Sequence, residues 1–417
     1  MALTFQSTLK RTKIALLLSG IKLEDVKFGR ILEFLFKNLF YFNFFWLGTD
    51  LVAETFGFIE GVQMGKNVIE LALTAPCFSI SLLGTAKSIF LFKHQNIVYK
   101  IILKLKNIHP ESATENDKLI AIDNSDVKAI GTTAIDEIDN NNIEDKIVEN
   151  SMKILNQINA VFNLFCSSVV IAFCLLPAAT MAYTYYTTGD LVYEYPYLTK
   201  YFFNHYTLER WPLVYLHQVY STAIVAANLL GADSLFHALC LYVEMHFQIL
   251  CKRFEKSTVG DENTVHNTFM ECVERHQELI ELVNNMEILY TKSTLFNIVM
   301  SSILICLNGF ILTVTSDVTI MIMFLTFLSM NLLQIFLLCY FGDLIMKSSV
   351  AVSSAIYNSP WYNTYSSSKK NVLFVIKRAQ KPCKLTACNY ADLNLSAFAT
   401  ILSRSWSYFA LLRSMYD

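Results

Sequence analysis

VFNLFCSSVVIAFCLLPAATMAY (Val161–Tyr183) is a run of 23 residues without a single charged side chain. A helix rises about 1.5 Å per residue, so this run is long enough to cross a hydrocarbon core about 30 Å thick. The whole chain has the same character. Of its 417 residues 54% are hydrophobic and only 16% are charged, and the mean hydropathy is +0.39. These values predict a protein that crosses the membrane several times.

Further apolar runs of similar length lie on both sides of this one. The chain contains only seven prolines, which favours long helices over a β-barrel with its frequent turns. We therefore predict an all-α, polytopic membrane protein with seven transmembrane helices. The predicted spans are Ile31–Phe58, Val68–Phe92, Val161–Tyr183, Pro212–Ala232, Thr294–Thr315, Val318–Phe341 and Leu393–Met415.

The distribution of Lys and Arg predicts the orientation of these spans. If the N-terminus is intracellular, the inner segments carry 26 Lys and Arg residues and the outer segments carry three. The positive-inside rule therefore favours an intracellular N-terminus and an extracellular C-terminus. This orientation is opposite to that of a G-protein-coupled receptor. The chain also has no Asp/Glu-Arg-Tyr triplet after the third span and no Asn-Pro-x-x-Tyr in the seventh.

The segments between the spans differ in composition. Acid-rich and Asn-rich text predicts a mobile cytoplasmic insert at 111–150, and apolar residues at helical spacing predict cytoplasmic helices that pack together. The aromatic loop between spans three and four either folds inward as a lid or sits at the headgroup belt. The predicted units are a cytoplasmic N-terminal segment 1–30, spans one to four 31–250, cytoplasmic anchor helices 251–292, spans five and six 293–346, a cytoplasmic anchor helix 347–392 and span seven 393–417.

The last span carries a stripe of small polar residues. Counting 100° per residue from Thr400, one sector of about 80° holds most of the stripe, with Leu411 and Arg404 just beside it. Such a stripe either binds neighbouring helices or lines a water-filled path. Arg404 favours the path, because a charge within a span usually faces a cavity or a partner. Several subunits would be needed to enclose a pore. The sector contains Ser396, Ser403, Ser407, Ala410 and Ser414.

The last ~75 residues resemble the C-terminal region of the insect odorant receptors. The similarity rests on a Tyr and a Trp after span six (Tyr357, Trp361), a basic helix leading to Arg378 and Pro382, and a Ser-Tyr pair in the final helix (Ser407-Tyr408). The resemblance implies a tetrameric, ligand-gated, non-selective cation channel. In that family odorants bind in the outer half of each subunit, the seventh helices line the pore, and tuning subunits assemble with a shared co-receptor.

The resemblance also distinguishes between classes of subunit. Related gustatory receptors end in Thr-Tyr, five residues and Gln-Phe, whereas Ser414 and Met415 occupy the last two positions here. The co-receptor has a long insertion between spans four and five, where this chain has a short link. Both differences favour a tuning subunit. The alternatives that stay open are a gustatory-type receptor channel, an inverted seven-helix metabotropic receptor or transporter, and a structural membrane protein whose stripe only binds other helices.

The site residues follow from the resemblance and from depth in the membrane. The final motif implies a constriction at Leu411, with pore or gate residues Thr400, Arg404, Ser407, Leu411, Ser414 and Met415. Depth alone places candidate ligand contacts on the outer halves of spans two, three, four and six. They are Thr74, Phe78, Phe173, Leu176, Thr180, Tyr215, Gln218, Met323, Phe324 and Phe327, a mostly apolar set suited to a small volatile compound.

The remaining patterns predict no catalytic, metal or cofactor site. Cys383 and Cys388 lack the His spacing of a zinc site, and His266 and His276 fit a solvated helix face. No phosphate-binding Gly loop or His-Glu-x-x-His pattern occurs, so we expect no enzyme. The expected partners are a hydrophobic or volatile odorant, an odorant co-receptor in a heterotetramer, membrane lipid and permeating cations, with no nucleic acid. The expected location is the plasma membrane of a sensory dendrite.

Overall fold

The chain is almost entirely helical. The computed structural model describes residues 9–23, 30–65, 68–108, 133–259, 261–364 and 366–416. The helices are α2 (Lys10–Leu18), α3 (Arg30–Gln63), α4 (Val68–Lys93), α5 (Gln95–Ile108), α7 (Thr133–Thr188), α8 (Trp211–Lys256), α9 (Glu262–Val314), α10 (Val318–Asn358), the 3-10 helix η1 (Trp361–Asn363), α11 (Ser366–Ala379) and α12 (Leu395–Tyr416). The antiparallel strands β1 (Thr386–Ala387) and β2 (Ala391–Asp392) precede α12. Apart from this short hairpin, the all-α prediction is confirmed for these residues.

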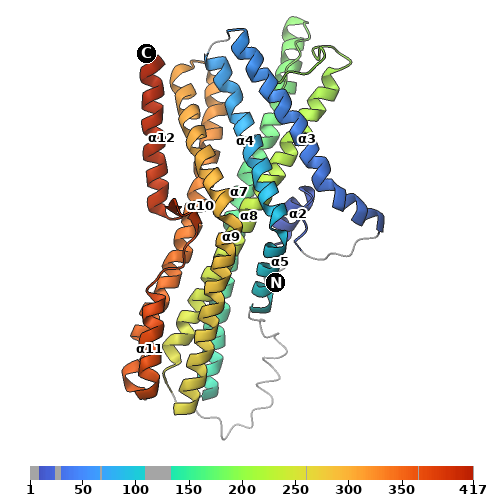
Figure 1. Cartoon of the computed structure of the whole chain (residues 1–417). Coiled ribbons are helices and arrows are strands. Elements are labelled where there is room, and N and C mark those ends of the chain that lie inside the picture. Colours follow the sequence, from blue (N-terminus) through green and yellow to red (C-terminus); the bar gives the residue numbers. More distant parts are fainter. Residues whose placement is uncertain are drawn as a thin grey trace.

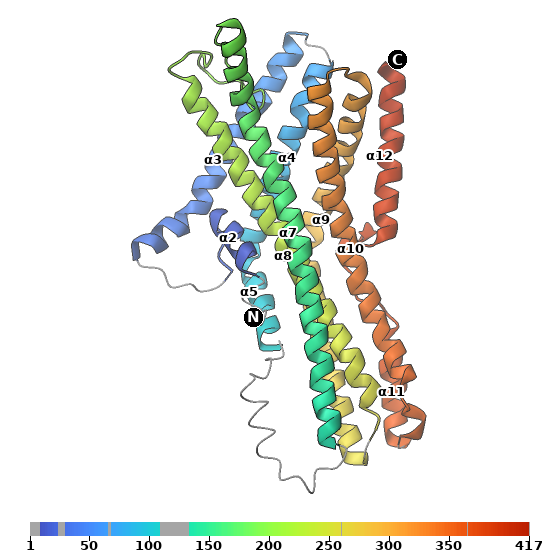
Figure 2. The ribbon, with the colours of Figure 1, turned by 180° about the vertical axis from the view of Figure 1, so that it is seen from behind.

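The helices form one elongated bundle. Helices α7 to α10 run through most of its length, while α3, α4 and α12 lie beside the upper half and α11 lies beside the lower end (Figures 1 and 2). The polar sequences that follow span four and precede span five therefore continue the transmembrane helices without a break. No proline interrupts the chain between Pro212 and the end of α9, so nothing in this stretch forces a helix to end at the membrane surface.

Five of the described helices are long and apolar enough to cross a membrane. They are α4 from Thr74, α7 from Asn142, α8, α9 and α10, and they contain predicted spans two to six. Predicted spans one and seven correspond to α3 and α12, which do not meet the same threshold of length and composition. Helix α3 carries Asp50 and Glu54 within its apolar run, and the hydroxyls of α12 lower its hydropathy. Both helices nevertheless lie alongside the upper half of the bundle (Figure 1).

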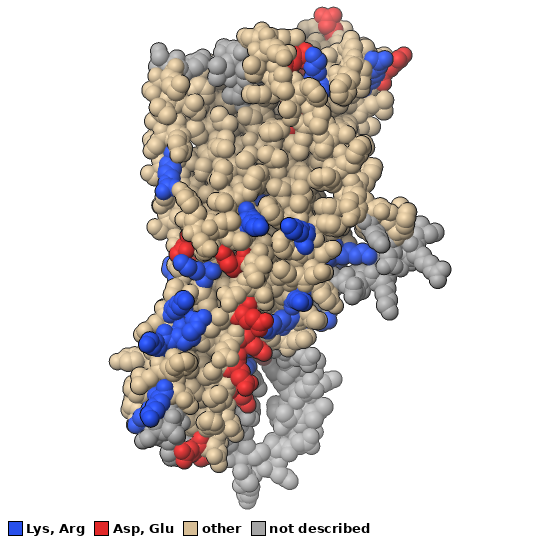
Figure 3. Space-filling model, in the orientation of Figure 1, with Lys and Arg blue, Asp and Glu red and all other residues tan. Residues whose placement is uncertain are grey.

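One band of the surface carries almost no charged side chains. In Figure 3 they gather over the lower half of the molecule and at its upper rim, and the band between them is nearly free of charge. A bilayer excludes charge from its hydrocarbon core. We therefore place the membrane around the upper half. Which side of the membrane each end faces stays a prediction from the positive-inside rule.

The main core lies around α8. Every residue from Gly231 to Phe247 is buried, so the middle of this helix is surrounded by its neighbours. Further down, the Phe254 ring meets the Phe269 ring of α9 at 5.6 Å between centroids in an edge-to-face contact. Apolar side chains spaced along these helices therefore pack together below the membrane band, as expected for helices too polar to face lipid.

The predicted mobile insert at 111–150 needs a correction. Residues 109–132 lie outside the described part of the chain, but α7 already begins at Thr133, so residues 133–150 are helical. Ile147 and Val148 pack against the main core, and both oxygens of Glu144 accept hydrogen bonds from Arg253 of α8, at 2.8 and 2.7 Å. The acidic composition concealed a helix that contacts the core through Ile147 and Val148.

A docked linker fixes the base of α12. The Thr386 backbone N–H donates to Glu287 Oε2 of α9 at 2.7 Å, and the Cys388 N–H donates to Thr291 Oγ1 at 2.8 Å. On α10, a Cβ added at Gly342 would lie 2.6 Å from the carbonyl oxygen of Leu393, so the close approach requires glycine. Asn394 then caps α12 by accepting a hydrogen bond from the Ala397 N–H at 2.7 Å.

Candidate functional site: an uncovered helix face and an apolar cavity

Helix α12 packs against the bundle through a narrow apolar face. Ile401 and Ser405 are buried on that face, and Phe409 and Leu412 pack against a small cluster of Phe310, Ile311 and Phe324. The first pair is four residues apart and the others follow at three or four residues, which is the spacing of one helix face. The orientation of α12 about its own axis is therefore fixed by its apolar residues.

The opposite face of α12 is uncovered and polar. The hydroxyl stripe lies there, and no other described part of this chain covers it. Thr400 donates to the Ser396 carbonyl at 2.9 Å and Ser407 donates to the Ser403 carbonyl at 3.0 Å. These hydroxyls are satisfied within their own helix, so they need no partner from the rest of the chain. All six residues predicted for the pore are exposed on this side: Thr400, Arg404, Ser407, Leu411, Ser414 and Met415.

Arg404 is anchored beside this face. Its Nη1 donates to the Tyr390 hydroxyl at 3.1 Å, and Tyr390 lies in the turn between β1 and β2. The guanidinium has five N–H donors, and this bond uses one of them. The linker thus positions the Arg404 cation beside the lower part of the uncovered face, and the bond to Tyr390 leaves its other N–H donors available.

A cavity of about 70 Å³ lies in the upper half of the bundle. Four helices line it, and one residue comes from the loop between α7 and α8. The lining is mostly aliphatic and aromatic, with a few thiols and hydroxyls, which is typical of a pocket for a small apolar molecule. The lining residues are Cys77, Ile80, Ser81, Cys166, Val169, Val170, Phe173, Tyr197, Thr222, Val225, Ala226, Leu229, Leu230, Phe327 and Met330.

The structure brings two of the ten predicted ligand contacts together in this cavity. Phe173 of α7 and Phe327 of α10 meet edge to face with ring centroids 5.6 Å apart. A third, Thr74, lines a larger outer hollow of about 420 Å³ between the end of α3 and the loop residues 198–206.

The other seven predicted contacts do not line either cavity. Thr180 donates to Glu194, Tyr215 donates to the Cys174 carbonyl, and Gln218 donates to the Tyr197 carbonyl. The remaining four are Phe78, which is half-buried, Leu176, which is exposed, and Met323 and Phe324, which pack with Phe310. Depth in the membrane was the only criterion for these residues, and depth does not say which way a helix is turned, although one residue turns the side chain by about 100°.

The loop residue Tyr197 is a cavity residue that the sequence reasoning missed. Its side chain is almost fully buried, and its ring stacks on Phe173 at 6.3 Å between centroids. Of the two interpretations of this aromatic loop, the structure favours the one in which it folds inward over the cavity. The signal was the high density of Tyr and Phe in a segment that was otherwise expected to face water.

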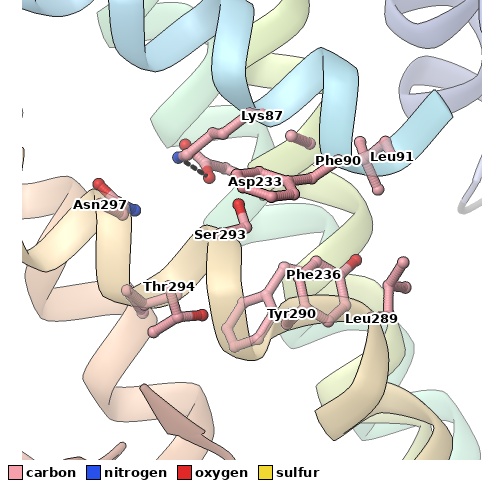
Figure 4. A pocket seen from close by; sticks show the side chains of 12 residues that line it. Lys87, Phe90, Leu91, Asp233, Phe236, Leu289, Tyr290, Ser293, Thr294 and Asn297 are labelled. Atoms are coloured by element: carbon pink, nitrogen blue, oxygen red, sulfur yellow. Dashed lines mark hydrogen bonds and ion pairs between the residues drawn. The ribbon is translucent and has the colours of Figure 1, made fainter. Parts of the chain in front are cut away.

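A buried ion pair lies below the cavity and was also missed. Lys87 Nζ of α4 is 2.5 Å from Asp233 Oδ1 of α8, and Gln334 of α10 donates to Asp233 Oδ2 at 2.6 Å. Figure 4 shows this pair beside Ser293 and Asn297 of α9, around a small cavity of about 20 Å³. With Gln334, the pair therefore joins α4, α8 and α10, three of the helices that line the cavity of about 70 Å³. The sequence signal for this pair was Lys87 itself, a charged residue inside an apolar span.

Comparison with known proteins identifies what this arrangement is similar to. The family profile described as 7tm Odorant receptor matches residues 132–405. Putative odorant receptor 92a of Drosophila melanogaster is 24% identical over 381 residues, covering 88% of this chain and 84% of the relative. Odorant receptor 67c of the same species is 23% identical, covering 92% and 89%.

The fold is similar to a solved structure over nearly its whole length. The insect olfactory receptor OR5 from Machilis hrabei, in complex with eugenol, superposes with a TM-score of 0.78. The two share 15% sequence identity, and the match covers 98% of this chain and 97% of the other. At this identity the match establishes the fold. The arrangement of the long helices is thus a known fold.

Proposed function

Because this chain belongs to the 7tm odorant receptor family, and is therefore a multi-pass membrane receptor and not an enzyme, we propose that it is an odorant-binding subunit of a ligand-gated, non-selective cation channel. In this proposal a small volatile compound binds the cavity between α4, α7, α8 and α10. Binding opens a central pore that the α12 helices of several subunits line. The location is the plasma membrane, at the dendrite of a sensory neuron.

The uncovered polar face of α12 is the observation that carries the pore proposal. One interpretation of the hydroxyl stripe is binding to neighbouring helices, but the stripe faces away from the bundle, so no described helix of this chain is such a neighbour. The stripe hydroxyls are satisfied within their own helix, so the argument against a lipid-facing helix rests on Arg404, because a guanidinium that faces lipid is costly. Water between subunits related by an axis solvates that charge, and four such helices around the axis would form a tetrameric pore.

The ligand proposal rests on the lining of the cavity. Phe173, Phe327 and the aliphatic side chains bury apolar surface, and that burial supplies most of the affinity for a small hydrophobic compound. The polar groups that reach the cavity are few, so the shape and the apolar area of the ligand would decide much of the tuning.

We place this chain among the tuning subunits, which assemble with a shared co-receptor. The support is the short connection between α8, which ends at Lys256, and α9, which begins at Glu262. A long insertion there is what the family resemblance leads us to expect of the co-receptor. The ending Ser414-Met415 likewise differs from the Gln-Phe ending of gustatory receptors.

Whole-cell recording tests this assignment. We expect cells that express this chain together with an odorant co-receptor to give a fast inward cation current when a panel of volatiles is applied, because the pore then has all its subunits. We expect the chain alone to give little or no current with the same panel. Surface labelling of the chain in both conditions is the control. A response of equal size without the co-receptor would contradict the tuning-subunit assignment, and a current that survives replacement of all permeant cations would contradict the channel.

A further inference from the structure

Helix α3 carries two buried carboxyl groups one helical turn apart. Asp50 is only 1% exposed and Glu54 only 4%. The Tyr197 hydroxyl donates to Asp50 and lies 2.9 Å from each of its oxygens. Glu54 differs, because neither of its oxygens has a hydrogen-bond partner within the described structure. A buried carboxyl group without a partner is costly, so its retention calls for an explanation.

Two bases lie near these acids among the described residues, and neither is paired with Glu54. His217 Nδ1 lies 3.8 Å from Asp50 Oδ1, and Lys200 is paired with Glu60 at the outer end of α3. Glu54 forms no ion pair with any described residue. Burial raises the pKa of the nearby Tyr201 phenol to about 12, and the carboxyl groups of Asp50 and Glu54 add to the rise.

A further buried acceptor without a partner belongs to Gln218. Gln218 is 0% exposed, and its Nε2 donates to the Tyr197 carbonyl at 3.2 Å and to Thr199 Oγ1 at 2.8 Å. The Oε1 of the same amide has no partner in the part of the chain that the structure describes. The amide thus places an unused acceptor beside the loop that bonds to Asp50, independently of the two acids. Among the described residues, Glu54 and the Gln218 Oε1 thus offer acceptors that no donor occupies.

This cluster lies between the two cavities of the upper half. Tyr197 lines the inner cavity with its ring and bonds to Asp50 with its hydroxyl. Thr199 and Tyr201 line the larger outer hollow, as does Gly57, three residues beyond Glu54 on α3. A molecule that occupies the inner cavity and extends past Tyr197 therefore meets the acceptor-rich cluster.

We propose that Glu54, supported by Asp50 and Gln218, receives the ammonium group of a small primary amine whose alkyl chain occupies the inner cavity. This inference rests on the proposed function and specifies its ligand class. An ammonium group carries three N–H donors and no acceptor, which is the complement of what the cluster offers. An alkylamine is protonated at neutral pH, as a Lys side chain is, so it also brings a cation that can pair with the Glu54 carboxyl group. The apolar lining takes the chain, and Glu54 takes the head group.

A thermal-shift titration of the purified full-length chain in detergent tests the inference without requiring a current. The two probes are hexylamine and hexan-1-ol, which have equal chain lengths and differ in the head group. We expect hexylamine to stabilise the chain at lower concentration than hexan-1-ol. In Glu54→Gln, which keeps the shape and removes the charge, the half-saturating concentration of hexylamine should rise at least tenfold and that of hexan-1-ol should stay within about twofold.

Two control variants locate the effect. Glu209→Gln removes an exposed acid of the same outer loop and should leave both titrations unchanged. Ala226→Phe fills the inner cavity and should weaken both ligands alike. Equal affinity of the two probes for the parent chain, or an undiminished effect of hexylamine in Glu54→Gln or Ala226→Phe, would overturn the inference. Amine-dependent stabilisation that is lost in Glu54→Gln, but with no current in cells, would instead retain the amine site and contradict the channel.

Discussion

Cells that express Leu411→Ser together with an odorant co-receptor are expected to pass a standing cation current before any odorant is applied. Leu411 lies on the uncovered face of α12, beside the hydroxyl stripe and near the outer end of the helix. In the proposed pore, a ring of such leucines excludes water from the closed state, since a narrow apolar constriction dewets. A serine hydroxyl binds water and removes that barrier. We expect the leak to exceed that of the parent chain at least tenfold.

A matched control separates this effect from a general loss of apolar surface. Leu325 of α10 has nearly the same exposure as Leu411, 58% against 59%, but it does not lie on α12. Leu325→Ser should therefore leave the resting current at the level of the parent chain. Whole-cell recordings at equal surface expression compare the two variants. Equal leak from both variants, or none from Leu411→Ser, would contradict a gate at Leu411.

Removing the buried lysine is expected to have the largest effect on stability. Lys87→Met leaves Asp233 as a buried carboxylate with no cation, and breaking a buried pair in this way costs about 3–5 kcal/mol. We expect the variant to melt at a clearly lower temperature in detergent and to reach the cell surface poorly. Size-exclusion chromatography after heating measures the first effect, and surface biotinylation measures the second.

Two further variants test that explanation. Lys87→Met combined with Asp233→Leu removes both charges and should recover most of the loss, with the remainder due to Gln334, which loses its acceptor. Lys153→Met breaks the exposed pair with Glu149 on α7, where both side chains are more than half exposed, and should leave the melting temperature nearly unchanged. If the double variant were as unstable as Lys87→Met, the unpaired charge would not be the cause.

Local pattern was sufficient for the fold and for α12. The apolar runs predicted spans two to six, and the hydroxyl spacing predicted which face of α12 stays uncovered, because a 3.6-residue period needs no information from other helices. The helical start of α7 was missed, since its acidic composition outweighed the weak apolar period of Ile147 and Val148. The continuation of α8 to Lys256 agrees with the cytoplasmic helices predicted from apolar residues at helical spacing.

The cavity could be predicted only in part. Phe173 and Phe327 were found, but Tyr197 comes from a loop whose path depends on its contacts with Asp50 and Gln218. The rotation of α4, α7, α8 and α10 about their axes is set by the packing of all four together. A single sequence therefore indicates that a cavity in this region would be apolar, without giving the residues that line it. The Lys87–Asp233 pair was missed for the same reason. Its two residues are 146 positions apart in the sequence, and only the packing of the helices brings them together.

The most direct test of the central claim is whether α12 faces the conducting path. Ser407 lies on its uncovered face, and Ser405 is buried against the bundle. With a co-receptor present, an impermeant, positively charged thiol reagent applied from outside is predicted to reduce the odorant current of Ser407→Cys irreversibly, and to do so faster while odorant is present. The parent chain and Ser405→Cys should be unaffected. An undiminished current in Ser407→Cys, at normal surface expression, would contradict a pore lined by this helix.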